Sequence, residues 1–181
     1  RSTLFPYTTL FRSRSVDYGN YTGDWAVNIG FADFNMDGHP EVYVRNNIYN
    51  AETGNLLVSV SSSNSGSSYA HWSHDTRWKL SAPMAADVYG DAKPELILGN
   101  QAYEISIPNT LGSSGNAATL LRMTPPPNDI MSDGHTQVAD FNLDGHLDVF
   151  VSLRNSYSNY GARVYGYVWD VFNNTTSSPF A

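Results

Sequence analysis

Residues Ala32–Val44 read ADFNMDGHPEVYV, and residues Ala139–Val151 repeat this stretch as ADFNLDGHLDVFV. Nine of the thirteen positions are identical, and three of the others are close exchanges (Met/Leu, Glu/Asp and Tyr/Phe). A weaker copy, ADVYGDAKPELIL, lies between them at Ala86–Leu98. The leading aspartates of the three copies are 54 and 53 residues apart. A repeat of this length favours four-stranded β-propeller blades over the shorter helical repeats.

The stretches around the three copies are typical of short β-strands. They are rich in Val, Ile, Tyr, Phe and Trp, turn residues bound them, and no stretch has the 3.6-residue periodicity of a helix. The predicted strands are Val27–Ala32, Glu41–Arg45, Leu56–Val60, Glu95–Leu98, Tyr103–Ile107, Asp148–Leu153 and Arg163–Trp169. Ala51–Gly54 predicts a hairpin turn. The sequence therefore predicts an all-β partial β-propeller of about three four-stranded antiparallel blades, with an acidic loop between the first and second strands of each.

The repeat also predicts the domain organisation. Residues 3–13, TLFPYTTLFRS, resemble the conceptual translation of a sequencing-adapter oligonucleotide, so residues 1–13 are expected to be an adapter-derived artefact. We expect residues 14–80 to form blade 1 with its connector, 81–135 blade 2 with its connector, and 136–181 blade 3. Propellers typically close with four to eight blades, so the remaining blades are expected to lie outside this chain or to come from another copy.

Each copy contains a nine-residue loop of the form D-x-N-x-D-G-x-x-[E/D], whose positions are numbered 1 to 9 below. Oxygen-bearing side chains at positions 1, 3, 5 and 9 suit Ca²⁺, which takes six to eight oxygen ligands. Position 7 is expected to offer its main-chain carbonyl, and glycine at position 6 to permit the turn. The predicted metal ligands are Asp33, Asn35, Asp37, His39 and Glu41 in the first loop, Asp87, Asp91 and Glu95 in the second, and Asp140, Asn142, Asp144, His146 and Asp148 in the third.

The second loop departs from this pattern. Tyr89 replaces the position-3 asparagine, Ala92 replaces the position-6 glycine, and Gly90 stands two residues early. The sequence therefore predicts two strong calcium sites and a weaker third. Solvated acidic turns would explain any one of these loops. However, nine of the seventeen acids fall in three loops in register, where they would repel one another without a cation.

The residues after each loop distinguish between families of calcium loop. An EF-hand needs an acid at position 12, where this chain has Val44, Leu98 and Val151. An acid at position 9 followed directly by a β-strand resembles the FG-GAP/VCBS repeats of integrin-α-like β-propellers. This resemblance implies a calcium loop between the first two strands of each blade. It also implies a non-catalytic extracellular scaffold, secreted or on the cell surface, for adhesion or recognition of a glycan or a cell-surface protein.

Two other function classes stay open: a part of a secreted polysaccharide-degrading enzyme, and a lectin module that stacks sugars on aromatics such as Trp25 and Tyr160. No G-x-S-x-G elbow is present, and most of the acids have a calcium explanation, so we predict no enzyme activity. A formal charge of −7 with only two lysines argues against nucleic-acid binding. No apolar run approaches the roughly 18 residues that a membrane span needs.

Overall fold

The chain is all-β, as the sequence predicts. The computed structural model describes residues 29–62, 82–124, 134–155 and 163–177, and these ranges contain twelve strands and no helix. The same ranges therefore contain no apolar helix of membrane-spanning length.

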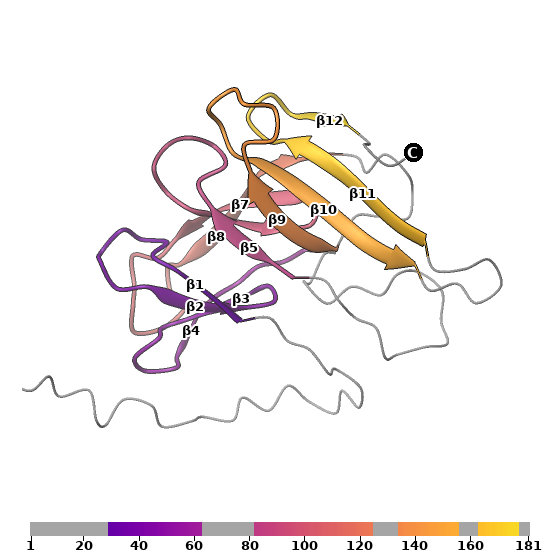
Figure 1. Ribbon diagram of the computed structural model, residues 1–181. Coiled ribbons are helices and arrows are strands. Elements are labelled where there is room, and N and C mark those ends of the chain that lie inside the picture. The colour runs from indigo at the N-terminus through magenta and orange to yellow at the C-terminus, as the bar shows by residue number, and fades with distance from the viewer. Residues whose placement is uncertain (1–28, 63–81, 125–133, 156–162, 178–181) are drawn as a thin grey trace, which may run out of the picture.

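The strands form three antiparallel sheets of four strands, and each sheet is a run of neighbours along the chain (Figure 1). Sheet 1 contains β1 (Ile29–Ala32), β2 (Glu41–Val44), β3 (Asn47–Tyr49) and β4 (Leu56–Ser59). Sheet 2 contains β5 (Met84–Ala86), β6 (Glu95–Leu98), β7 (Gln101–Ser106) and β8 (Ala117–Met123). Sheet 3 contains β9 (His135–Ala139), β10 (Asp148–Asn155), β11 (Arg163–Asp170) and β12 (Thr175–Ser177).

Each of the seven strands predicted from the sequence overlaps an observed strand, and the predicted turn at Ala51–Gly54 connects β3 to β4. The five strands that the sequence did not reveal are β3, β5, β8, β9 and β12. Three of these are only three residues long, and β8 reads AATLLRM, in which alanine and long flexible side chains give little β signal.

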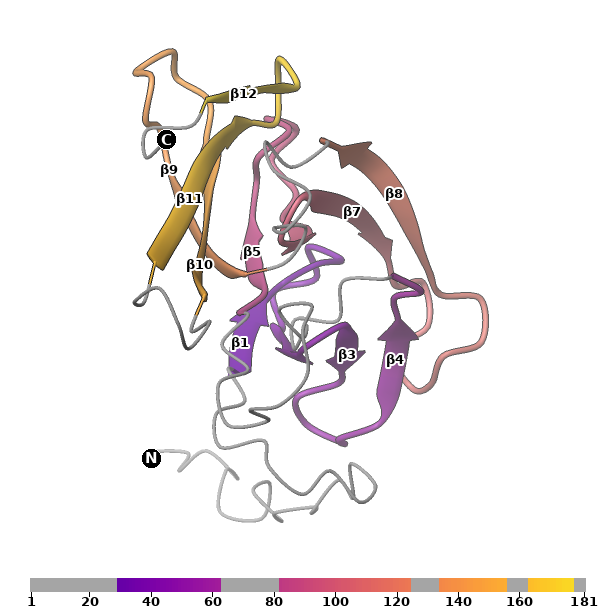
Figure 2. The ribbon, with the colours of Figure 1, turned by 90° about the vertical axis from the view of Figure 1, so that its right-hand side faces the viewer.

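The first strands of the three sheets lie side by side: β1 contacts β5, and β5 contacts β9 (Figure 2). An isolated parallel bridge joins Ala82, just before β5, to His135 at the start of β9. The Ala82 main-chain N–H donates to the Gly134 carbonyl at 3.1 Å, and the Thr136 N–H donates to the Ala82 carbonyl at 3.3 Å. Backbone hydrogen bonds thus fix the position of sheet 3 against sheet 2.

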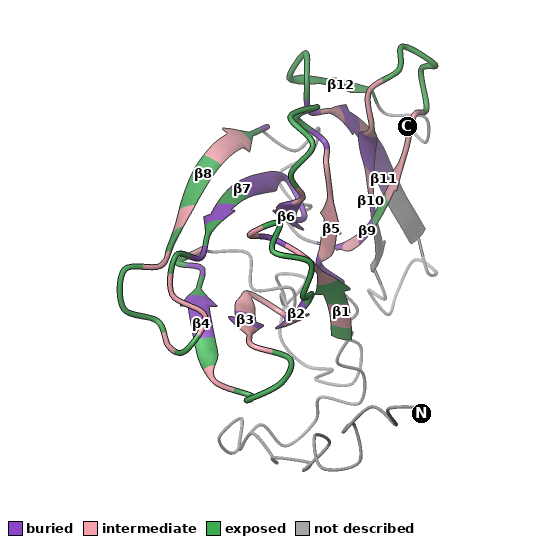
Figure 3. Ribbon diagram, turned by 90° about the vertical axis from the view of Figure 1, so that its left-hand side faces the viewer, coloured by how far each residue is buried: buried purple, intermediate pink, exposed green. Residues whose placement is uncertain are grey.

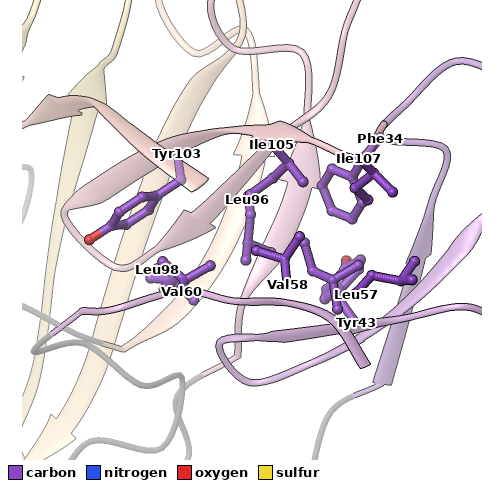
Figure 4. Packing of buried hydrophobic residues seen from close by; sticks show 11 residues of the cluster. Phe34, Tyr43, Leu57, Val58, Val60, Leu96, Leu98, Tyr103, Ile105 and Ile107 are labelled. Atoms are coloured by element: carbon purple, nitrogen blue, oxygen red, sulfur yellow. The ribbon is translucent and has the colours of Figure 1, made fainter. Parts of the chain in front are cut away.

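Two hydrophobic cores fill the spaces between consecutive sheets. The first core, shown in Figure 4, lies between sheets 1 and 2 and the second between sheets 2 and 3, so that sheet 2 is covered on both faces. The first core consists of Phe34, Tyr43, Ile48, Leu57, Val58, Val60, Leu96, Leu98, Tyr103, Ile105 and Ile107. The second consists of Val88, Ile97, Ala102, Val149, Val151, Tyr167, Trp169 and Val171. Burial of these side chains is the main favourable contribution to the stacking of the sheets.

Candidate metal-binding loops

The three acidic loops connect β1 to β2, β5 to β6 and β9 to β10, which is the placement that the sequence predicts. They lie on the same side of the molecule in Figure 1, and most of their residues are exposed (Figure 3). Loops 33–41 and 140–148 are called the outer loops below, and loop 87–95 the middle loop. In each of them, position 9 is also the first residue of the sheet's second strand.

The position-1 aspartate organises the backbone of every loop in the same way. In the first loop, Asp33 accepts hydrogen bonds from the main-chain N–H groups of Asp37 at 3.0 Å and Gly38 at 2.8 Å. The corresponding distances are 3.1 and 2.9 Å at Asp87 and 3.1 and 3.0 Å at Asp140. Because these bonds hold positions 5 and 6 against position 1, all three loops curl around their leading carboxylate.

The position-9 acid closes each loop from the inside. Its carboxylate accepts the main-chain N–H of position 2 at 2.9 Å for Glu41, 3.0 Å for Glu95 and 2.9 Å for Asp148. All three acids are buried, whereas the acids at positions 1 and 5 are half-buried or exposed. Each loop therefore sets one buried carboxylate beneath two more accessible ones.

The loops differ at position 3. In the first loop the Asn35 side chain accepts the Asp37 N–H at 3.1 Å and donates from Nδ2 to Asp37 Oδ2 at 3.0 Å. In the third loop Asn142 makes the same two contacts with Asp144, at 2.9 and 3.1 Å. Tyr89 has no side-chain amide, so the matching carboxylate of the middle loop, Asp91, accepts only the Lys93 N–H among the described residues, at 3.0 Å.

The Tyr89 side chain contributes to an aromatic cluster between sheets 2 and 3. Its ring lies 6.5 Å from the Phe172 ring, and the Arg122 guanidinium lies 5.5 Å from the Tyr89 ring centre. The His146 ring stacks on Phe172 at 3.8 Å. Positions 3 and 7 of neighbouring loops thus contribute packing contacts in addition to any ligand role. At position 7 of the first loop, the exposed His39 ring lies 4.0 Å from Glu52.

Three carboxylates converge most closely in the middle loop. Ligand atoms of Asp87, Asp91 and Glu95 all lie within 4.8 Å of one another. Of all the acids and histidines whose positions the structure describes, only these three form so compact a group. The sequence ranks this loop as the weakest site, yet its acids are already the most closely gathered.

The loop backbone is left-handed at two positions, of which the sequence reveals only the sixth. Position 6 has a positive φ in all three loops: Gly38 at 87°, Ala92 at 71° and Gly145 at 92°. Position 4 does too: Met36 at 60°, Gly90 at 79° and Leu143 at 62°. Each loop places glycine at one of the two positions and bears the strain of a side chain at the other. The middle loop therefore has glycine at position 4 and a side chain at position 6, the reverse of the outer loops, and the turn keeps its shape.

Burial raises the pKa of all three position-9 acids. Desolvation is the main cause at each, and the neighbouring loop acids add repulsion, while the N–H bonds to the carboxylate act in the opposite direction. The pKa of Glu95 rises to about 7. Raised pKa values mean that the negative charge at position 9 is poorly compensated by the protein itself.

The donor set fits a hard cation such as calcium. None of the described residues donates a hydrogen bond to the buried Oδ1 atom of Asp148, although this atom carries a full share of the carboxylate charge. Within the described part of the chain, no lysine or arginine forms an ion pair with any of the nine loop acids. A divalent ion held by the acids of positions 1, 5 and 9, with the Asn35 and Asn142 amide oxygens in the outer loops, would supply that missing positive charge.

Comparison of the chain with protein-family models, with curated proteins and with solved structures gives no match. The FG-GAP/VCBS assignment therefore remains a hypothesis based on the loop residues. The aromatic candidates for sugar stacking, Trp25 and Tyr160, lie outside the described residues.

Proposed function

We propose that this chain is part of a calcium-stabilised, non-catalytic β-propeller scaffold that serves adhesion or recognition outside the cell. The observation that carries the proposal is the repetition of one hydrogen-bonded acidic loop, with one buried carboxylate, between the first two strands of three consecutive sheets. The side-by-side first strands and the two inter-sheet cores support the propeller part of the proposal. Its glycan or protein ligand would bind elsewhere on the scaffold.

Calcium would stabilise the folded conformation of each loop. Each loop is largely exposed, and the hydrogen bonds that its position-1 aspartate accepts lie among exposed groups, which stabilise little by themselves. An ion that binds the folded loop and not the unfolded chain adds its binding free energy to folding. Calcium outside cells is abundant enough to fill loops of modest affinity, which is the basis for the proposed location.

Calorimetric titration of the chelator-stripped chain with Ca²⁺ tests this function. We expect two tighter sites and one weaker site. Asp33→Asn and Asp140→Asn should each remove one tight site, because each neutralises a position-1 carboxylate while conserving its size. Glu104→Gln, at an exposed acid of β7, is the matched control and should leave the titration unchanged. Absence of calcium uptake, or loss of all three sites in the control, would contradict the proposal.

A further inference from the structure

Positions 5 and 6 of the outer loops form an Asp–Gly bond, Asp37–Gly38 in the first loop and Asp144–Gly145 in the third. The middle loop has Asp91–Ala92 at the same place. In an Asp–Gly bond the glycine main-chain nitrogen can attack the aspartate side chain. Glycine favours this reaction because it has no Cβ to crowd the nitrogen and because it adopts more backbone conformations than other residues. The glycine that permits the turn of the outer loops therefore also makes their position-5 aspartates reactive.

The reaction isomerises the aspartate and uses only water. In the first loop, the Gly38 nitrogen forms a bond to Cγ of Asp37. One oxygen of the Asp37 carboxylate leaves as water, with the proton of that nitrogen and one proton from the solvent. Water then opens the resulting succinimide ring at the Asp37 main-chain carbonyl and a proton is released. The product is isoaspartate, in which the main chain runs through Cβ and Cγ and the mass is unchanged.

Both Asp–Gly bonds lie where the structure leaves space for this change. The two aspartates and the two glycines are all exposed. A Cβ added to Gly38 or to Gly145 would meet no atom within 4 Å among the described residues. Packing against neighbouring residues therefore does not hold either bond in place, so any restraint has to come from the hydrogen bonds of the loop itself.

The closed loop holds the reacting groups in other hydrogen bonds. The Gly38 N–H donates to Asp33 at 2.8 Å. The Asp37 carboxylate accepts the His39 N–H at 2.8 Å and the Asn35 side-chain amide at 3.0 Å. The three corresponding distances in the third loop are 3.0, 2.9 and 3.1 Å. Attack requires the nitrogen and the carboxylate to leave these partners, so the reaction proceeds from locally opened loops.

We propose that Asp37 and Asp144 are sites of spontaneous isomerisation to isoaspartate, which the closed loop slows and bound calcium slows further. Both residues are proposed calcium ligands at position 5, so a bound ion would keep each carboxylate in its closed-loop place. Conversion lengthens the backbone by one carbon and moves the carboxylate away from position 5. An outer loop that stays empty would therefore lose its site permanently, whereas the middle loop, with Ala92 at position 6, would keep its own.

The inference rests on the proposed function only for the effect of calcium, because the isomerisation itself follows from the loop residues and their hydrogen bonds. It is tested by incubating the 181-residue chain in EDTA and in calcium near physiological temperature and pH. Enzymatic methylation of isoaspartyl groups measures the conversion. Peptide mapping with fragmentation assigns it to a residue, and separates Asp144 from Asp133, whose own Asp–Gly bond lies outside the acidic loops.

In EDTA we expect conversion at Asp37 and Asp144 and little at Asp91. A hundredfold excess of calcium over its Kd should slow the two outer sites by about a hundredfold, because only the empty, opened loop reacts. No conversion at the outer sites in EDTA, or equal conversion at Asp91, would overturn the proposal. If calorimetry shows calcium uptake but calcium does not slow conversion, this inference fails and the proposed function stands. Absence of uptake would overturn the calcium effect together with the proposed function, while the measurements in EDTA still decide the isomerisation.

Two variants of the first loop test its role in EDTA, with Asp144 in the same molecule as the matched control. Asp33→Ala removes the acceptor of the Gly38 N–H, so conversion at Asp37 should rise about tenfold as the opened fraction of the loop increases. Gly38→Ala copies position 6 of the middle loop and should slow conversion at Asp37, and the added methyl group has space. Conversion at Asp144 should stay the same in both variants.

The first-loop variants also give the results that would contradict the role of the loop. Slower conversion at Asp37 in Asp33→Ala would show that this carboxylate assists the attack by taking the proton from nitrogen. An equal rise at Asp144 would show that the hydrogen bonds of the first loop do not control its own reaction. Unchanged conversion in Gly38→Ala would overturn the role of glycine. Tryptophan fluorescence checks that each variant folds.

Discussion

The outer loops and the middle loop reach one backbone arrangement with different residues. The outer loops have an amide at position 3 and glycine at position 6, whereas the middle loop has Tyr89 and Ala92 there and moves its glycine to position 4. Three main-chain hydrogen bonds nevertheless recur in all three loops: the N–H groups of positions 5 and 6 donate to the position-1 carboxylate, and that of position 2 donates to the position-9 carboxylate. This comparison shows that the two acids define the loop, while the glycine position and the amide are variable.

The two kinds of loop differ in what lies between their acids. In the outer loops an asparagine amide donates to the position-5 carboxylate, at 3.0 and 3.1 Å. In the middle loop this amide is missing, and the three acids converge within 4.8 Å. The outer loops thus offer one more neutral oxygen ligand, and the middle loop offers negative charges that are already gathered. The calcium affinities of the two kinds of loop depend on which of these two features contributes more.

Calcium removal should have the largest effect. A site held at a hundredfold excess of calcium over its Kd stabilises the folded chain by about 2.7 kcal/mol, and the chelator removes that contribution. We expect the double variant Asp33→Asn/Asp140→Asn to lose most of the difference in free energy of unfolding between calcium and EDTA, and Asp87→Asn to lose less. Urea unfolding followed by tryptophan fluorescence measures these differences. An equal loss in Asp87→Asn and the double variant would show that gathered charge compensates for the missing amide.

The pH dependence of the calcium-free chain should come mostly from the middle loop. Glu95 has a pKa of about 7 when folded against 4.5 otherwise, so the folded chain binds a proton that the unfolded chain releases between these values. The resulting stabilisation is fully present below about pH 4.5 and is lost as the pH rises through 7. Its size is on the order of 3 kcal/mol, from the size of the pKa shift. Unfolding in EDTA at a series of pH values measures it.

The variant Glu95→Gln isolates this contribution. In EDTA at pH 8 it should be more stable than the unaltered chain, because an uncharged amide replaces a buried carboxylate and its oxygen still accepts the Val88 N–H. In calcium, Glu95→Gln should instead be less stable than the unaltered chain, because a charged calcium ligand is lost. A pH dependence in EDTA that Glu95→Gln does not reduce would assign the effect to the outer acids, Glu41 and Asp148, whose pKa values burial also raises.

Restoring the amide should make the middle loop the tightest site. Tyr89→Asn adds the neutral oxygen ligand of the outer loops to three acids that already converge, and we expect about a tenfold gain in calcium affinity, or about 1.4 kcal/mol. The variant also removes the ring from the contact with Phe172 and Arg122, so Tyr89→Ala is the control for that loss. Calorimetry should show tighter binding in Tyr89→Asn alone. Equal titrations in the two variants would mean that the position-3 amide is not a ligand.

Sequence reasoning located the loops because their acids, amides and glycines recur at a fixed spacing. It also placed the strands that are rich in β-branched and aromatic residues. It did not find short or alanine-containing strands such as β5 and β8, because neighbouring strands hold these in place while their own residues have weak preference. Nor did it find the left-handed backbone at Met36 and Leu143, since neither residue type favours that conformation. The main-chain N–H groups of the two residues after Met36 donate to Asp33, and those of the two residues after Leu143 donate to Asp140. These hydrogen bonds impose the left-handed conformation.

The smallest expected effect concerns the position of the glycine. At φ 71° Ala92 bears the strain of a left-handed alanine, about 1 kcal/mol, which Ala92→Gly relieves. Glycine also makes the unfolded chain more flexible, which lowers the free energy of unfolding by about 0.4–1 kcal/mol. The net change in stability should therefore be close to zero. The reverse exchange, Gly145→Ala, meets no atom within 4 Å and should cost about 1 kcal/mol from strain alone.

Gly90→Ala should cost more than Gly145→Ala, because its new methyl carbon would lie 3.3 Å from Nδ1 of His146, in the stack on Phe172. Urea unfolding in EDTA compares the three variants without interference from calcium. Equal costs for Gly90→Ala and Gly145→Ala would show that the His146 ring moves aside freely. The glycine of the middle loop would then be needed for its backbone conformation alone, and not for packing against the neighbouring sheet.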